Sequence, residues 1–181
     1  MKVFLEPPGQ LKVFEEIREQ LQKANGLLSV SGVTDAAKPH LCYALGREWQ
    51  KNLIITYDEQ RAREIVDAYR YFRQNEEGSV LYFPAKDLLF YQSDIRGSAI
   101  SKERMQALEA LVTEAHPVVV TTMDALLGRV PASGRLLDAC LFLSQGDVID
   151  LEESRTRLVS MGYSGEYQAE QPGQFAVRGG I

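Results

Sequence analysis

The chain has 181 residues, 45% of them hydrophobic and 25% charged, and a formal net charge of −5, which predicts a soluble globular protein of one domain, or one domain with a small appendage. No apolar run approaches the ~20 residues that span a bilayer, and the first residues are too acidic for a signal peptide. We therefore expect a cytoplasmic protein. In that compartment Cys42 and Cys140 are expected to be reduced core thiols. The acidic balance disfavours a general DNA-binding protein, because affinity for the phosphate backbone comes mainly from Lys and Arg, but it is compatible with a small local basic patch.

An N-terminal helix is predicted over residues 10–24, where apolar residues recur at helical spacing. Gly26 ends this helix, since glycine is the usual residue just past a helix C-terminus. Residues 27–30, LLSV, form a short apolar run bounded by turn signals, which predicts a buried strand. A second helix is predicted over residues 36–50.

Between the strand predicted at 27–30 and the following helix lies a degenerate phosphate loop. The phosphate-loop motif GxxxxGK(S/T) wraps phosphates with backbone N–H groups, neutralises them with Lys and holds Mg²⁺ with Ser or Thr. Gly32 and Lys38 stand at the spacing of this motif, but Ala37 replaces its second glycine and Pro39 replaces its Ser or Thr. The loop therefore has the position of a nucleotide site but lacks the second glycine and the Ser or Thr of the motif. Lys38 can still bind an anion at a helix N-terminus.

Strands and helices alternate over the next ninety residues. Near-continuous apolar strands separated by helices predict a parallel sheet covered on both faces, and right-handed crossovers then give an open three-layer α/β domain. The predicted strands are 53–56, 80–83 and 118–121. The predicted helices are 59–74, capped by Asp58, 102–115, capped by Ser98 or Ser101, and 123–128. Residues 85–97 are predicted to be irregular, with the apolar residues 88–91 packing back on the domain.

The pattern changes after residues 130–134, VPASG. We expect a strand at 139–143, a helix from Asp150 to Met161 opened by a capping box, and strands of an antiparallel type at 163–169 and 175–177. From Cys140 onward the sequence contains six acidic and three basic residues, which gives a net charge of 3 − 6 = −3. The predicted domains are a phosphate-loop-like lobe over 1–137 and the start of a small α+β domain over 138–181, which predicts that the sequence is a fragment.

The residues provide no complete active site. A phosphate-loop ATPase needs an acid after a later strand to hold Mg²⁺; Asp124 is the acid shortly after strand 118–121, and its position indicates a helix cap. Thr34 and Asp35 are likewise interpreted as caps of the following helix rather than as metal ligands. His40 and His116 have no clustered Cys, Asp or Glu beside them, so no metal site and no catalytic residue is predicted.

Several short motifs nevertheless occur in a characteristic order. They are residues 32–38, LIIT at 53–56, the stretch 82–91 that begins with YFP, DI at 94–95, residues 103–108, VVTT at 119–122, LLGRVP at 126–131, LVSMGY at 158–163 and PGQFAVRGGI at 172–181. In this order they resemble the N-terminal part of the bacterial transcription-repair coupling factor (Mfd) family, a region that is similar to the excision-repair helicase UvrB. The resemblance implies a RecA-like lobe with a degenerate Walker A motif, followed by the beginning of a UvrA-binding domain.

That resemblance also implies a function. Members of the family couple transcription to nucleotide excision repair by displacing stalled RNA polymerase with an ATP-driven DNA translocase and recruiting UvrA. This stretch would be a non-enzymatic module that binds UvrA and uses no cofactor; ATP, Mg²⁺, RNA polymerase and DNA would belong to modules of the parent protein. Arg178 matches an arginine that contacts UvrA, and its guanidinium suits a carboxylate partner.

Two alternatives remain open at the level of sequence. The first is a UvrB-type phosphate-loop ATPase or helicase lobe that binds ATP and DNA, and the second is a DNA-binding lobe. Ala37 and Pro39 argue against ATP turnover. Residues 84–97 are too few for the long hairpin with which UvrB clamps a DNA strand.

Overall fold

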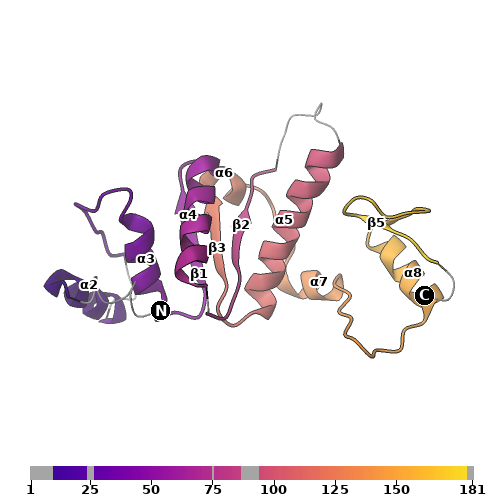
Figure 1. The fold of residues 1–181 in the computed structure, drawn as a ribbon, viewed down its shortest axis with the longest axis horizontal. Helices are drawn as coiled ribbons and strands as arrows, with labels where there is room; N and C mark the ends of the chain where they lie inside the picture. The colour runs from indigo at the N-terminus through magenta and orange to yellow at the C-terminus, as the bar shows by residue number, and fades with distance from the viewer. Residues whose placement is uncertain (1–9, 24–26, 75, 87–93, 179–181) are drawn as a thin grey trace.

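The computed structural model describes residues 10–23, 27–74, 76–86 and 94–178, with the side chains of 94–98 left aside (Figure 1). The predicted packing of residues 88–91 and the last three residues of the sequence lie outside this part. The helices are α2 (Lys12–Lys23), α3 (Lys38–Gly46), α4 (Glu59–Phe72), α5 (Asp94–Thr113), α6 (Met123–Leu126), α7 (Ser133–Asp138) and α8 (Leu151–Ser160); the strands are β1 (Asn52–Thr56), β2 (Val80–Phe83), β3 (Val118–Thr122), β4 (Ser164–Gly165) and β5 (Gln174–Phe175).

A parallel three-stranded sheet organises the first part of the chain, in the order β1-β3-β2. Ile54 and Tyr82 both lie in register with Val120 of the central strand. The chain moves from β1 across the sheet to β2 and then back to β3, so right-handed crossovers place α4 and α5 on opposite faces. Figure 1 shows this arrangement, with α3 packed against α4. The predicted mixed α/β class and the parallel sheet are confirmed.

The alternation of side chains along β3 creates two cores. Val118 and Val120 point to the α4 face, where they join Ile65, Tyr69 and other residues of a large cluster. Val119 points to the α5 face and packs with a second cluster around Phe83, Ala107 and Ala125. All five residues of β3 are buried, as expected for a parallel strand that is covered on both faces.

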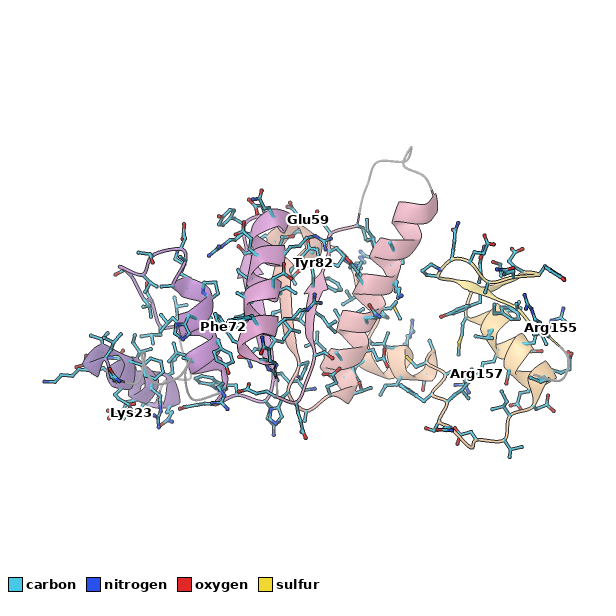
Figure 2. The ribbon with its side chains drawn as sticks, in the orientation of Figure 1. Lys23, Glu59, Phe72, Tyr82, Arg155 and Arg157 are labelled. Atoms are coloured by element: carbon cyan, nitrogen blue, oxygen red, sulfur yellow. The ribbon has the colours of Figure 1, made fainter. Side chains whose placement is uncertain are left out.

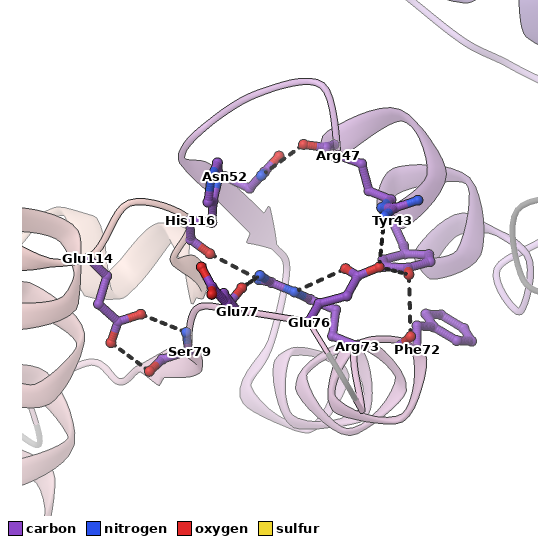
Figure 3. Close-up of polar contacts among 11 residues, drawn as sticks. Tyr43, Arg47, Asn52, Phe72, Arg73, Glu76, Glu77, Ser79, Glu114 and His116 are labelled. Carbon is purple, nitrogen blue, oxygen red and sulfur yellow. Dashed lines mark hydrogen bonds and ion pairs between the residues drawn. The ribbon is translucent and has the colours of Figure 1, made fainter. Parts of the chain in front are cut away.

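Polar contacts at the amino end of the sheet fix α3 to the end of α4 (Figure 3). The Tyr43 hydroxyl donates to a Glu76 carboxylate oxygen at 2.9 Å, and that carboxylate also pairs with Arg47 at 3.0 Å and with Arg73 at 3.6 Å. Phe72 lies between the two helices (Figure 2), with its ring centroid 5.3 Å from that of Tyr43. These contacts hold α3 in place although α3 covers little of the sheet itself.

Local signals predicted α4 and α6 well. Asp58 caps α4, because its side chain accepts from the Arg61 backbone N–H at 2.7 Å. The short helix after β3 is also present, but Thr122 caps it through its side chain and Asp124 lies in its first turn. The predicted strands at 53–56, 80–83 and 118–121 all exist, each within one residue of its expected bounds.

Other predictions about the first part were wrong. Residues 27–30 form no strand, and Leu27 is 99% exposed, because the apolar run finds no place in the sheet. Helix α3 begins at Lys38 and ends at Gly46, inside the predicted range of 36–50. Helix α5 begins at Asp94, so Ser98 and Ser101 lie within it and cap nothing at its start.

The second part differs more from expectation. Residues 139–143 form no strand, while α7 was not predicted at all. Strands β4 and β5 pair in parallel over two residues each, not antiparallel. Cys42 is exposed and Cys140 is half-buried, so neither is a core thiol. Within the described residues, no helix combines the length and the apolar character needed to cross a membrane.

Candidate functional site

The predicted phosphate loop leads directly into α3, of which Lys38 and Pro39 are the first two residues. Gly32 has a φ of +80°, in the left-handed region that favours glycine. The backbone N–H groups of Ala37 and Lys38 both donate to the Thr34 carbonyl oxygen, at 3.0 and 3.1 Å. In a phosphate loop such N–H groups point at the ligand; here these two close a turn of the chain itself.

The lysine of this loop is paired within the loop. Lys38 Nζ lies 2.6 Å from Asp35 Oδ1, and this hydrogen bond lowers the pKa of the Asp35 carboxyl. Arg61 of α4 donates to the Asp35 carbonyl. The N-terminus of α3 has no side-chain cap, so the interpretation of Thr34 and Asp35 as caps was wrong. The loop keeps its lysine, but a carboxylate of the same loop pairs with it.

The two histidines do not form a metal site. The His40 ring lies 5.4 Å from that of Phe72, whereas the His116 carbonyl accepts from Arg73 at 3.1 Å (Figure 3). In the part of the chain that the structure describes, no three residues among His, Cys, Asp and Glu are grouped closely enough to hold a metal ion.

The C-terminal region is built around α8. The Asp150 side chain accepts from the backbone N–H groups of Glu152 and Glu153, at 2.8 and 2.9 Å, which confirms the predicted cap. Arg157 donates to the Cys140 carbonyl at 2.9 Å and ties the helix to the segment that precedes it. Arg155 and Arg157 both project from this helix (Figure 2). None of the ten residues of α8 is buried.

A turn at Gly162, with a φ of +91°, reverses the chain after α8. The backbone N–H of Ser164 donates to Gly173 at 2.9 Å, and that of Glu166 donates to Phe175 at 2.8 Å. The Gln174 side-chain oxygen accepts from two backbone N–H groups of the intervening loop. Backbone hydrogen bonds, rather than a buried core, therefore hold β4 and β5 together.

Arg178 follows β5 by three residues and is exposed. Its guanidinium carbon lies 5.9 Å from the centroid of the Tyr167 ring, a cation–π contact. Tyr167 is itself 93% exposed. Sequence reasoning singled out Arg178 but missed Tyr167, because nothing in the sequence shows that the loop between β4 and β5 brings the ring to this arginine.

Several apolar side chains of the same region are also exposed. They come from the segment before α8, from α8 and from the residues after β5, and more than two fifths of the surface of each is exposed: Phe142, Leu143, Val148, Ile149, Leu151, Val159 and Val177. Such a group of exposed apolar residues marks an interaction surface, and aromatic residues with arginine are enriched at the centres of protein interfaces. We call residues 141–178 the C-terminal surface.

The structure therefore divides the predicted site residues between two elements. Gly32, Ala37, Lys38 and Pro39 lie together at the start of α3, whereas Arg178 lies at the end of the C-terminal surface. Neither group contributes a side chain to the other in the described contacts. The C-terminal surface offers a guanidinium, an aromatic ring and exposed apolar side chains.

A protein-family model described as the UvrB interaction domain matches residues 141–181. The whole chain is also similar to transcription-repair-coupling factors. It is 24% identical to that of Bacillus subtilis over 92% of this chain and 13% of the relative, and 26% identical to that of Staphylococcus haemolyticus over 94% of this chain and 14% of the relative.

The UvrABC system protein B of Thermosipho africanus is 25% identical over 97% of this chain and 28% of its own length. The chain thus spans less than a third of each of these relatives. Both coupling factors and UvrABC system protein B match nearly all of it, and the family model coincides with the C-terminal surface. The resemblance predicted from the motifs is confirmed: this chain is similar to the N-terminal, UvrB-like region of transcription-repair-coupling factors.

Proposed function

We propose that this chain is a recruitment module of transcription-coupled nucleotide excision repair and that it binds UvrA through its C-terminal surface. The observation that supports this most is the coincidence of two independent features over the same residues. The UvrB interaction domain matches 141–181, and the same stretch leaves apolar side chains, Tyr167 and Arg178 exposed. Contact with UvrA would cover them.

Arg178 is the proposed centre of the contact. An exposed guanidinium that rests on an aromatic ring is held in place before binding, so less side-chain entropy is lost when a partner carboxylate binds it. The fork of N–H donors matches a carboxylate bidentately. The region from Cys140 to Ile181 carries a net charge of −3, so the specific position of Arg178, and not overall attraction, would select an acidic group on UvrA.

The remaining residues would form a scaffold. We propose that 1–137 is a lobe derived from a phosphate-loop ATPase with a degenerate Walker A motif, that 138–181 begins a separate UvrA-binding domain, and that this chain takes no cofactor and turns over no ATP. The Lys38–Asp35 pair and the turn at Thr34 support the loss of nucleotide binding. ATP, Mg²⁺, DNA and RNA polymerase would be bound by other modules of a parent coupling factor.

Titration of UvrA onto the immobilised chain tests this function. We expect saturable binding that weakens at least tenfold in Arg178→Ala and recovers only partly in Arg178→Lys, which keeps the charge but loses the fork. Lys12→Ala on α2 is the matched control, since it removes the same charge from an exposed position outside the C-terminal surface, and it should bind as the unaltered chain does. Absence of UvrA binding to the folded chain would overturn the proposed function.

The second candidate is an ATP-binding lobe of the UvrB type, which the similarity to UvrABC system protein B favours. The two candidate functions differ in whether the chain binds Mg-ATP. Calorimetric titration with Mg-ATP should give no heat of binding if the recruitment function is correct. Micromolar binding that disappears in Lys38→Ala would establish the ATP-binding alternative instead.

A further inference from the structure

A cavity of about 450 Å³ lies at the carboxyl ends of β2 and β3. Lys86 enters it from the segment after β2, Arg104 from α5, and Arg129 from the segment after α6. Figure 1 shows α6 directly at the end of β3 and α5 beside β2. In open parallel sheets this is the edge at which ligands bind, because loops from different strands converge there.

The lining of the cavity is basic on one side and apolar on the other. Its charged residues are Lys86, Arg104 and Arg129, and no described residue that lines it is acidic. Most other cations of the first part are paired; for example, Arg61 lies 2.9 Å from Glu64, and Arg63 lies 2.8 Å from Glu59. No carboxylate among the described residues lies within 4 Å of the three cations of the cavity.

Arg104 is the most informative of the three because it is only 5% exposed. Its Nη1 donates to the Pro84 carbonyl, and its guanidinium carbon lies 3.9 Å from the centroid of the Phe83 ring. Burial lowers the pKa of this arginine, yet the group stays charged at neutral pH. Burying a charge without a counter-charge is unfavourable, so such an arginine is unusual in a purely structural role.

The N–H donors of Arg104 that do not bind the Pro84 carbonyl remain accessible from the cavity. No sealed side-chain nitrogen or oxygen in the described residues lacks a partner, so the other guanidinium nitrogens face space that solvent or a ligand can enter. Arg104 Nη2 lies 3.5 Å from the position that a Cβ on Gly128 would take. Gly128 therefore lies close to this nitrogen without a side chain between them.

We propose that this cavity binds the phosphate group of a small phosphate monoester. Lys86, Arg104 and Arg129 together offer the donors and the positive charge that a tetrahedral dianion requires, with Arg104 able to bind it bidentately. Ile100, Met105, Leu108 and Val130 line the apolar side and would contact the organic body. The cavity is of the size that takes small molecules, and a net charge of −5 on the whole chain disfavours an extended nucleic acid strand.

The test uses the full chain and phenyl phosphate, which joins a phosphate dianion to a small apolar body. Calorimetry at low ionic strength should give one site per chain. The double variant Lys86→Gln/Arg129→Gln should weaken binding at least tenfold, whereas the charge-matched Lys12→Gln/Arg155→Gln should leave it unchanged. Both residues of the first pair are exposed, so the variant keeps the fold. Arg104→Gln should abolish binding, provided that circular dichroism shows the variant to be folded.

Four outcomes would overturn the proposal. The first is the absence of heat with phenyl phosphate at millimolar concentration. The second is equal binding by the Lys86→Gln/Arg129→Gln variant and the unaltered chain. The third is a loss of binding in Lys38→Ala, which would move the anion to the loop before α3. The fourth is a single-stranded oligonucleotide that displaces phenyl phosphate and binds more tightly than it. UvrA binding is read separately, so either proposal can fail without the other.

Discussion

The sheet region, residues 38–138, and the C-terminal surface, residues 141–178, are stabilised in different ways. In the sheet region, β3 is buried along its whole length and two clusters pack on its faces. On the C-terminal surface, α8 buries no residue and the two strands have two residues each. The first region buries two apolar clusters, although side chains such as Leu53 and Leu127 stay exposed, whereas the second leaves most of its large apolar side chains exposed. Removing one aromatic ring from each region should therefore show the difference between the two regions most clearly.

The largest effect is expected from a pair of tyrosine truncations. Tyr69 is 2% exposed in the α4 cluster and Tyr167 is 93% exposed. Tyr69→Ala should lower the free energy of unfolding by about 3–5 kcal/mol, the usual cost of removing a buried aromatic ring. Tyr167→Ala should leave thermal unfolding unchanged and weaken UvrA binding about tenfold, because the cation–π contact that orients Arg178 is lost. Denaturant titration and binding measurements check the two halves.

This contrast fails if Tyr167→Ala unfolds the chain, since the C-terminal surface would then have a core that depends on this ring. It also fails if Tyr69→Ala costs less than a typical surface substitution. Tyr167→Phe keeps the ring and should behave as the unaltered chain in both measurements.

A smaller difference is expected from two glycines with positive φ. Gly78 has a φ of +93°, and a Cβ there would lie 2.1 Å from the His116 carbonyl oxygen; Gly162 has a φ of +91° with nothing within 4 Å. Both substitutions to Ala impose a left-handed conformation, which costs about 1–2 kcal/mol. Gly78→Ala must also displace backbone, so its loss in unfolding free energy should exceed that of Gly162→Ala by at least about 1 kcal/mol. Equal losses would show that the His116 turn is free to move.

The smallest expected effect is a loss of stability of the sheet region at alkaline pH. Burial, with help from the Glu76 carboxylate, raises the pKa of Tyr43 to about 12. The folded state therefore favours the neutral phenol, and its contribution to stability is complete below pH 10 and is lost as the pH rises towards 12. Tyr43→Phe should be less stable by about 1 kcal/mol at pH 7, for the lost hydrogen bonds.

Urea unfolding at intervals from pH 8 to 12 measures this dependence. The fall in stability between pH 10 and 12 should be shallower in Tyr43→Phe than in the unaltered chain. Parallel curves would mean that Tyr43 ionises as easily in the folded state as in the unfolded one. Tyr167→Phe on the C-terminal surface is the control and should give a curve parallel to that of the unaltered chain.

The sequence by itself determined the elements whose signal is local. Asp58 and Asp150 cap helices where predicted, and three apolar runs became β1, β2 and β3, because a cap needs only neighbouring N–H groups and an apolar strand needs only to be buried. The motifs also identified the similarity to coupling factors. The same local reasoning failed at residues 27–30 and 139–143, which are as apolar as true strands but have no neighbouring strand to pair with.

Only the tertiary structure decided which groups meet. It placed Tyr167 beside Arg178 across a loop, paired Lys38 with Asp35 in the degenerate loop, and gathered Lys86, Arg104 and Arg129 around one cavity from three segments. None of these relations follows from spacing, because a cation looks the same in a sequence whether a carboxylate, an aromatic ring or an empty cavity lies beside it. The balance of burial and pairing that sets the role of each cation exists only once the chain is folded.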